Sequence, residues 1–265
     1  MASPERIKLV AETVKKHVHQ DKTIAVFSAF GGVTNDLLKM AELAAKEDLA
    51  YKEILAQNEK RHLDAVKELI PVQNQSGVLS KVKTEFNQLE TLYEGVYLLN
   101  ELSNKTKHVV SSFVEILSSL IIAEYFKSLA TDALLIDSRE LIVCKNNNEK
   151  IQLNYEQTNK SIVQYFKEND ASLFVVPGFV AKNEQGVPIT LGRGGSDFTA
   201  AIFGGALDVA KVIIYTDVNG MYTANPNVVH QAYPLQNISY QEAMELSHFG
   251  AKVLYPPTLQ PLLDK

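Results

Sequence analysis

The sequence predicts an α/β fold in which helices cover both faces of a mostly parallel sheet. Short apolar runs such as 23–28 and 172–178 lack polar–apolar alternation, so we expect buried strands there. Longer segments with apolar residues at helical spacing separate these runs, and strands that alternate with helices favour parallel pairing. The 265 residues, of which 46% are hydrophobic, allow one large domain or two small ones, and we expect one that spans 1–265.

Composition and charge argue against several classes of protein. The net charge of −5 and the lack of a basic run make a nucleic-acid partner unexpected. No apolar stretch approaches the roughly 20 residues of a membrane span, so we expect no membrane partner, and the N-terminus lacks the apolar core of a signal peptide. One cysteine, Cys144, fits a reducing cytoplasm. The six histidines lack paired ligand spacing, so we expect no structural zinc.

The first elements in order are a helix, a strand and a glycine loop. Ser3-Pro4-Glu5 combines the cap, proline and acid of a helix start, and apolar residues recur at helical spacing to about His19. The strand at 23–28 then ends in a loop that contains Gly31-Gly32 and feeds a helix. Ligands bind at this edge of open α/β sheets, so the loop is a candidate site.

Residues from about 35 to 129 are predicted to be mostly helical. Pro71 and the cluster 73–77 break two amphipathic segments, and we interpret 48–104 as a helical excursion that serves as a lid or an oligomer contact. The helix at 109–123 is apolar nearly all round, and Glu115 is its only charge. A buried carboxylate without a partner is costly, so Glu115 must meet a ligand, a set of donors or a cation in a structural ion pair.

The second half of the chain supplies the remaining elements. We expect strands at 133–137, 141–144 and 212–216, a helix at 154–169, and a hairpin at 179–191 with its turn at 183–186. A last helix opens at Ser239-Tyr-Gln-Glu242, which has the spacing of a capping box, and closes at Gly250.

The stretch 192–197, Gly-Arg-Gly-Gly-Ser-Asp, is the strongest candidate for a functional loop. We expect Ser196 to open a helix that stops near 204–205, and the glycines before it let a ligand approach the unpaired N–H groups. Arg193 adds a fork of donors for a carboxylate or a phosphate, and Asp197 adds a carboxylate. The alternative is an ordinary turn in which Ser196 caps the helix and Asp197 complements its dipole.

Four stretches of the sequence together carry a family resemblance. They read Ser-Ala-Phe-Gly-Gly-Val-Thr-Asn at 28–35, Gly-Arg-Gly-Gly-Ser-Asp at 192–197, Thr-Asp-Val-Asn-Gly-Met-Tyr-Thr at 216–223, and Ser-Tyr-Gln-Glu-Ala-Met-Glu-Leu-Ser-His-Phe-Gly-Ala-Lys-Val-Leu at 239–254. With them the whole chain resembles the catalytic domain of aspartate kinases. The second and third stretches are shared more widely by amino-acid kinases, whereas the last is narrower.

The resemblance implies a three-layer α/β/α sandwich, the amino-acid kinase fold. It implies transfer of the γ-phosphoryl group of ATP to the side-chain carboxylate of L-aspartate, which gives 4-phospho-L-aspartate at the entry to lysine, threonine and methionine synthesis. ATP and Mg²⁺ would be the cofactors, with the metal held through the phosphates and by no side chain directly. The full-length protein would form a homo-oligomer.

The resemblance also implies roles for individual residues. Thr34, Glu115 and Arg193 would hold aspartate, with Glu115 receiving its ammonium group and Arg193 a carboxylate. Asp197 and Arg193 would take part in catalysis. Ser196 would contact the substrate. The phosphate loops would be formed by Gly31, Gly32, Gly194 and Gly195. The nucleotide would be contacted by Thr216, Asp217, Tyr222 and Lys252.

The chain departs from the family pattern at its ends and near the nucleotide. The family opens with a Lys-Phe-Gly-Gly-Thr-Ser strand whose lysine stabilises the transferring phosphoryl group, and residues 1–6 resemble those that follow it. We therefore expect that the strand is truncated and that this chain alone has low activity. Asn219, Asn227 and Tyr255 replace the usual Asp, Arg and His. The chain stops at Lys265, before the regulatory ACT domains, so no regulatory domain is expected.

Two other functions stay open. The lack of the lysine motif fits a non-catalytic module that binds aspartate or a nucleotide without turnover. A related amino-acid kinase with another acceptor is the second alternative, and a comparison of aspartate with glutamate and acetylglutamate as acceptors would separate it.

Overall fold

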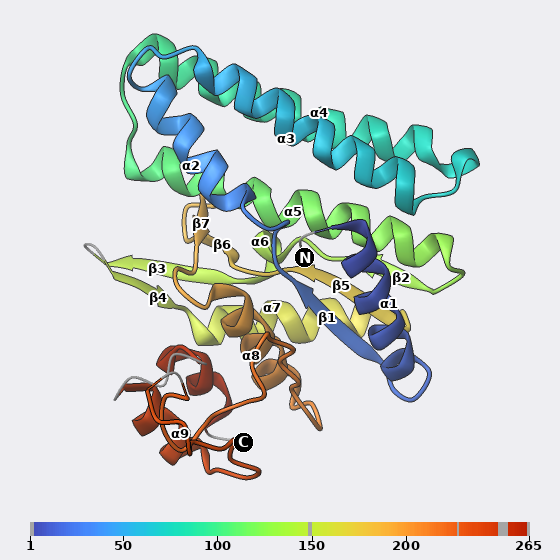
Figure 1. The fold of residues 1–265 in the computed structure, drawn as a ribbon, viewed down its shortest axis with the longest axis vertical. Helices are drawn as coiled ribbons and strands as arrows, with labels where there is room; N and C mark the ends of the chain where they lie inside the picture. The colour runs from blue at the N-terminus through green and yellow to red at the C-terminus, as the bar shows by residue number, and fades with distance from the viewer. Residues whose placement is uncertain (1–2, 148–149, 227, 249–253, 264–265) are drawn as a thin grey trace.

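The chain folds into two β-sheets with helices on both sides (Figure 1). This computed structural model describes residues 3–147, 150–226, 228–248 and 254–263. Of the fold prediction, the mixed α/β class with a parallel sheet is confirmed. The strands form a three-stranded and a four-stranded sheet, and the three-layer arrangement around one central sheet stays a prediction.

The three-stranded sheet is parallel throughout. Its order is β1 (Thr23–Phe27), β5 (Leu173–Pro177) and β2 (Ala133–Leu135). All five residues of β5 are buried, as its unbroken apolar run predicts for the central strand of a parallel sheet. The carboxyl ends of β1 and β5 lie side by side, since Phe27 pairs with Pro177.

The second sheet mixes parallel and antiparallel pairs. Its order is β4 (Lys150–Leu153), β3 (Val143–Asn147), β6 (Val180–Asn183) and β7 (Pro188–Thr190), and only the β3–β6 pair is parallel. The expected β6–β7 hairpin is confirmed, and the Asn183 side chain accepts hydrogen bonds from the turn. The strand expected at 141–144 begins later, because the short helix α6 (Ser138–Leu141) precedes it.

Helices from the first half of the chain cover one side of the sheets (Figure 1). They are α2 (Val33–Ala44), α3 (Ala50–Leu69), α4 (Val72–Leu99) and α5 (Asn104–Ser128), with α1 (Pro4–Val18) beside β1. The range 48–104, expected to be a helical excursion, holds the long pair α3 and α4, which packs on α2 and α5. The two helices separate at Pro71 as expected, but the cluster 73–77 does not break a helix, because it lies inside α4. The interpretation of 48–104 as a lid or an oligomer contact stays a prediction.

Helix α5 is more apolar than the sequence analysis allows for. By length and composition alone it is long and apolar enough to cross a membrane, so the expectation that no apolar stretch approaches that length is wrong. However, 83% of its most apolar stretch is buried inside the protein, where α5 packs against α2, α4 and the parallel sheet. Its apolar surface is therefore accounted for by the core.

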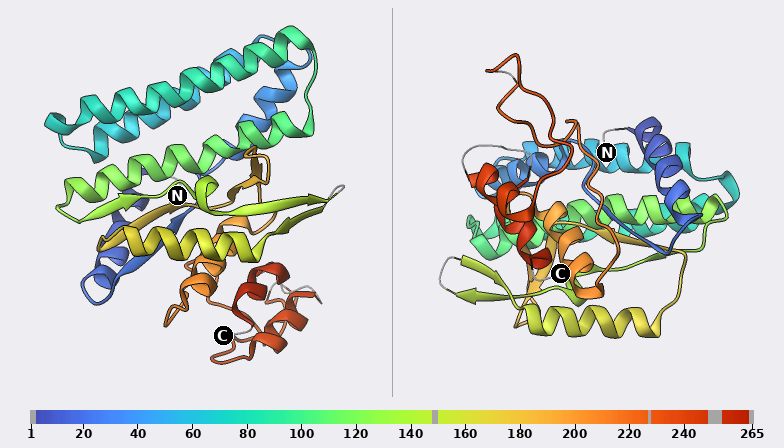
Figure 2. Two further views of the ribbon diagram at one scale, coloured as in Figure 1. Left: turned by 180° about the vertical axis from the view of Figure 1, so that it is seen from behind. Right: turned by 90° about the horizontal axis from the view of Figure 1, so that it is seen from below.

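Two helices lie on the other side of the sheets, α7 (Tyr155–Glu168) and α8 (Gly195–Leu207) (Figures 1 and 2). After α8 come an irregular stretch, α9 (Tyr240–His248) and the 3₁₀ helix η1 (Pro256–Leu262). The capping box at the start of α9 is confirmed, because Ser239 and Glu242 exchange hydrogen bonds. The expected end of this helix at Gly250 lies outside the described residues.

The strand expected at 212–216 is wrong. Residues 211–216 form no strand, and Ile213 and Tyr215 are exposed. A β-branched run becomes a strand only where a neighbouring strand offers hydrogen bonds, and no strand in the described part of the chain pairs with it. Instead, Val212 lies against Gly204 of α8, and the Tyr215 hydroxyl is 2.8 Å from His17 Nε2.

Candidate functional site

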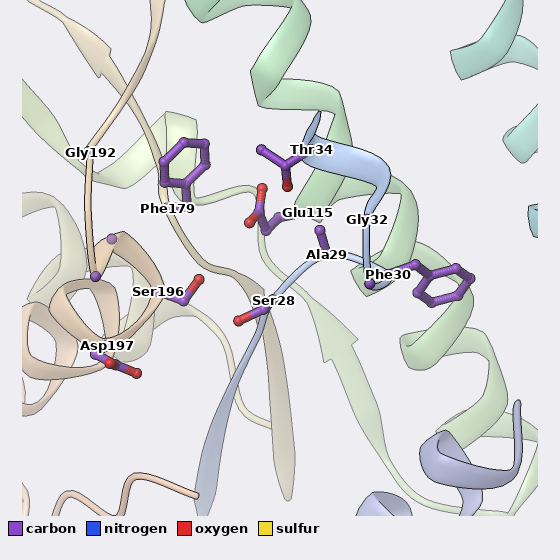
Figure 3. A pocket seen from close by; sticks show the side chains of 13 residues that line it. Ser28, Ala29, Phe30, Gly32, Thr34, Glu115, Phe179, Gly192, Ser196 and Asp197 are labelled. Atoms are coloured by element: carbon purple, nitrogen blue, oxygen red, sulfur yellow. The ribbon is translucent and has the colours of Figure 1, made fainter. Parts of the chain in front are cut away.

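A pocket of about 400 Å³ opens where the ends of several elements meet. The carboxyl ends of β1 and β5, the N-termini of α2 and α8 and the middle of α5 surround it (Figure 3). The lining residues are Ser28, Ala29, Phe30, Gly31, Gly32, Thr34, Glu115, Phe179, Gly192, Gly194, Gly195, Ser196 and Asp197. The pocket thus brings together both glycine loops and the buried acid that the sequence singles out.

The first glycine loop turns the chain from β1 into α2. Gly32 is the N-cap of α2 with a φ of 88°, a conformation that residues with a side chain rarely adopt. The Val33 N–H donates to the Phe30 carbonyl at 3.1 Å, which closes the turn. Thr34, in the first turn of α2, then lies beside the Glu115 carboxylate (Figure 3).

The second glycine loop leads from β7 into α8. Gly192 and Gly194 have φ angles of 77° and 66°, and Gly194 is the N-cap. The expected start of α8 at Ser196 is therefore wrong, and so is the alternative in which Ser196 is the cap: Ser196 lies in the first turn, and no side chain caps α8. The Gly195 N–H donates to the Gly192 carbonyl at 3.0 Å, which closes this turn. The N–H groups of Ser196 and Asp197, in the first turn of α8, have no helical acceptor and are therefore available to an anion at this end of the pocket.

Helix α8 also continues past its expected end. It runs through Gly204 and Gly205 to Leu207. A Cβ at Gly205 would lie 2.3 Å from the Pro261 carbonyl oxygen, so these glycines allow η1 to pack closely on the helix. Their role is close packing within a helix, which overrides their low helix propensity.

Two further glycines let the strand ends approach α8. A Cβ on Gly178 would lie 2.6 Å from the Ser196 Cβ, and one on Gly195 would lie 2.7 Å from the Phe179 ring. The Phe179 N–H donates to Thr199 Oγ1 at 3.1 Å, and Thr199 Oγ1 donates to the Gly195 carbonyl at 2.8 Å. These contacts fix the carboxyl end of β5 against the first turn of α8.

Glu115 is the only strongly buried acid of the pocket. It is 5% exposed, and its Oε2 has no hydrogen-bond partner. Burial raises the pKa of the Glu115 carboxyl to about 8, although the backbone N–H of Ala29 offsets part of this rise. No cation among the described residues forms an ion pair with Glu115, so the structure does not support the alternative of a structural ion pair.

Asp197 and Arg193 differ in their placement. Asp197 lies in the first turn of α8, lines the pocket, and has a pKa raised above its ordinary value by burial. Arg193 lies between two lining glycines, but its side chain is exposed and does not line the pocket. The structure therefore brings the predicted site residues Thr34, Glu115, Ser196 and Asp197 together, and places Arg193 at the margin.

The residues predicted for the nucleotide lie apart from this pocket. Thr216 and Asp217 are exposed, and Thr216 Oγ1 donates to Asp217 Oδ1 at 3.1 Å. Tyr222 forms an isolated bridge with Pro234 in the irregular stretch after α8, which extends away from the sheets (Figure 2). Lys252 lies outside the described residues. None of the three described residues lines the pocket.

Four lining residues outside the predicted loop 192–197 were not predicted from the sequence as site residues: Ser28, Ala29, Phe30 and Phe179. Ser28 and Ala29 follow β1 directly, so the position of a residue just after a parallel strand is the signal for them. Phe179 follows β5 in the same way and has a φ of 66°, which is unusual for an aromatic residue. Its ring stands over the Glu115 end of the pocket (Figure 3).

The chain is similar to aspartokinases over almost its whole length. It is 31% identical over 264 residues to the bifunctional aspartokinase/homoserine dehydrogenase 2, chloroplastic, of Zea mays, which covers 99% of this chain and 29% of that protein. It is 32% identical over 269 residues to aspartokinase 1, chloroplastic, of Arabidopsis thaliana, covering 98% of this chain and 46% of that protein. The chain thus spans less than half the length of these curated relatives.

Solved structures agree with the sequence matches. E. coli aspartokinase III in complex with aspartate and ADP superposes with a TM-score of 0.87 at 27% identity, over 99% of this chain and 57% of that one. The same enzyme in complex with lysine and aspartate gives a TM-score of 0.81 at 26% identity, over 96% of this chain and 56% of that one. The family model described as "Amino acid kinase family" matches residues 1–265, and the chain belongs to this family.

Proposed function

We propose that this chain is the catalytic domain of an aspartate kinase. It would transfer the γ-phosphoryl group of ATP to the side-chain carboxylate of L-aspartate and form 4-phospho-L-aspartate. The observation that carries the proposal is the buried Glu115 carboxyl between two glycine loops, whose Oε2 has no hydrogen-bond partner. The superposition with an aspartokinase that holds aspartate and ADP supports it, and the three-layer arrangement of the amino-acid kinase fold belongs to the same proposal.

Glu115 would receive the ammonium group of aspartate. Burial favours the protonated carboxyl of Glu115, whereas a cation at hydrogen-bond distance favours the carboxylate. Binding of the ammonium group would therefore ionise Glu115 and release its proton. The Thr34 hydroxyl, which lies beside this carboxylate, would add a hydrogen bond at the same end of the substrate (Figure 3).

The carboxylates and phosphates would face the two glycine loops. Gly31, Gly32, Gly194 and Gly195 line the pocket and let anions approach the backbone N–H groups, and Ser196 adds a hydroxyl. Arg193, whose exposed side chain starts between two lining glycines, would close over a substrate carboxylate. Such a site neutralises charge and holds acceptor and donor in line, which is most of what phosphoryl transfer requires, without a covalent intermediate.

The nucleotide is proposed to bind beside α8, with contacts from Thr216, Asp217, Tyr222 and Lys252. Mg²⁺ would supply charge neutralisation as part of MgATP. Asp197, half-buried in the first turn of α8, would orient the groups that contact these phosphates.

One observation favours the second candidate, a module that binds aspartate or a nucleotide without turnover. No lysine or arginine of the described chain lines the pocket, so its walls contribute no transition-state cation. Such a cation is worth several kcal/mol of barrier in phosphoryl transfer.

The test is an acceptor comparison. The chain is incubated with MgATP and L-aspartate, L-glutamate or N-acetyl-L-glutamate, and the acyl phosphate is trapped with hydroxylamine. The proposal expects a hydroxamate with L-aspartate only. A hydroxamate with another acceptor favours a related kinase. L-aspartate binding without product, both in this chain and in a version extended upstream with the lysine strand, favours the binding module.

A further inference from the structure

One face of α3 contacts the first glycine loop and the start of α2. Arg61 Nη1 donates to the Gly31 carbonyl at 2.8 Å. The His62 ring stacks on Phe30, with the ring centroids 4.7 Å apart and the planes at 11°. Asn58 Nδ2 donates to Asp36 Oδ2 at 3.2 Å, in the first turn of α2. Two of these contacts are with the turn after β1, at Phe30 and Gly31, and the third is with the first turn of α2, at Asp36.

The spacing of the three α3 residues explains why they act on the same turn. Asn58, Arg61 and His62 stand three and four positions apart on a helix, so their side chains share one face. The Arg61 guanidinium also lies 5.9 Å from the Phe30 ring centroid, within the range of a cation–π contact. Phe30 is therefore in contact with both side chains, and it is only 4% exposed.

His62 is buried in the core, where its neutral form is favoured. It is fully buried, its Nδ1 is 2.8 Å from the Asn58 carbonyl oxygen, and burial lowers its pKa to about 4. On its other side Phe86 of α4 contacts it edge-on, with the ring centroids 5.2 Å apart. His62 therefore connects Phe86 of α4 to Phe30 through one edge-on and one stacked ring contact. The Phe30 ring points away from the pocket (Figure 3).

The hydrogen bond from Arg61 orients the loop peptide. A trans peptide is planar, so the N–H of Gly32 points opposite to the Gly31 carbonyl that Arg61 holds. Gly31 and Gly32 both line the pocket, so an N–H of Gly32 that points away from Arg61 would face into it. A backbone donor aimed at an anion before it binds needs no reorganisation when it does.

We propose that Arg61 and His62 are positioning residues, which hold the Gly31-Gly32 peptide so that the Gly32 N–H faces the anionic end of the acceptor substrate. The long helix pair α3 and α4 is then a support of the pocket. The identity of the anion as the acceptor substrate rests on the proposed function, whereas the positioning of the Gly31-Gly32 peptide by Arg61 and His62 does not. Neither side chain lines the pocket, so both act through the loop.

The first test reads the loop directly. In Arg61→Ala, the carbonyl-carbon resonance of Gly31 and the amide resonances of Gly31 and Gly32 are expected to shift, since the peptide between the two glycines loses a hydrogen bond from a charged donor. Gly194 and Gly195 serve as internal controls and should stay unchanged. Lys60→Ala, which removes an exposed neighbour on α3, should leave all four resonances in place. Unchanged Gly31 and Gly32 amides in Arg61→Ala overturn the proposal.

The second test reads substrate binding by calorimetry. Arg61→Ala is expected to weaken L-aspartate binding by about 10-fold or more and MgADP binding by less than about 2-fold, and added guanidinium should restore part of the loss. His62→Ala should act alike, whereas His62→Phe, which keeps a flat ring against Phe30, should bind nearly as the parent chain does. Equal loss for both ligands, or no effect of guanidinium, contradicts a positioning role and indicates general destabilisation.

The two tests separate the inference from the function. If the parent chain does not bind L-aspartate but Arg61→Ala shifts the Gly31 and Gly32 resonances, the proposed function fails and the positioning of the loop by Arg61 stands. If the parent chain binds L-aspartate and Arg61→Ala binds it equally well, the inference fails and the function stands.

Discussion

Glu115 shows how one buried residue links stability to function. In the empty pocket its carboxyl holds a proton that the unfolded chain releases above a pKa of 4.5, and it keeps this proton up to a pKa of about 8. Its contribution to the free energy of unfolding therefore falls as the pH rises from 4.5 to 8. His62 acts in the opposite direction: its folded pKa of about 4 lies below 6.5, so stability falls as the pH drops from 6.5 to 4.

The first prediction separates these two residues. Between pH 6.5 and 8 the ligand-free chain should lose on the order of 1–2 kcal/mol of unfolding free energy through Glu115. Glu115→Gln should abolish this loss and keep the rise between pH 4 and 6.5, to which the lowered pKa values of His62 and His108 contribute. Urea titrations at several pH values measure both effects. Glu124→Gln is a matched control on the same helix, because that carboxylate pairs with Lys81 and Lys127 at the surface. A Glu115→Gln profile that parallels the parent profile contradicts the burial of an acid here.

The second prediction concerns Arg193. Its side chain is exposed, so Arg193→Lys should change the unfolding free energy by less than about 0.5 kcal/mol. L-aspartate affinity should nevertheless fall by about 10-fold or more, because a lysine is a point charge and cannot bind a carboxylate through two parallel hydrogen bonds. Equilibrium titration checks this, and an affinity equal to that of the parent chain would remove Arg193 from the site.

At the scale of single elements, close packing at glycines positions the pocket. Gly178→Ala should cost about 1–3 kcal/mol of stability, because its Cβ would lie 2.6 Å from the Ser196 Cβ and would push α8 away from β5. It should weaken L-aspartate binding as well. Thermal unfolding and titration of the same variant test the two effects together.

Gly77→Ala supplies the matched control. Gly77 lies inside α4, and a Cβ there would meet nothing within 4 Å. Alanine is the better helix former, so this variant should gain about 0.5–1 kcal/mol and bind as before. If both glycine variants behave alike, packing at Gly178 does not shape the pocket.

The elements divide into those that local patterns determine and those that tertiary partners determine. Helices α3 and α4, the β6–β7 hairpin and the capping box of α9 were predictable, because periodicity, turn residues and cap residues act within a few positions of one another. The run 212–216 has the pattern of a strand but finds no partner strand among the described residues. The start of α8 was misplaced because a glycine in the left-handed conformation, rather than Ser196, is its N-cap.

At the scale of the whole molecule, the pocket joins segments that are far apart in the chain. Loop residues near 30 and 194, the middle of α5 and the end of β5 meet because the strands β1 and β5 are neighbours. The sequence located both loops and Glu115, since glycines after strands and a lone charge in an apolar helix are local signals. It did not locate Phe179 or the support from Arg61 and His62, since these depend on which elements pack together.

The most direct measurement is a calorimetric titration of the chain with L-aspartate near pH 7, in two buffers that differ in ionisation enthalpy. We expect L-aspartate binding to release close to one proton. The Glu115 carboxyl, with a pKa of about 8, is mostly protonated near pH 7 and becomes ionised when the ammonium group binds. Glu115→Gln should lose both the proton release and most of the affinity. Binding of L-aspartate by the parent chain without proton release, or with equal affinity in Glu115→Gln, would contradict the claim that this pocket receives the amino acid on Glu115.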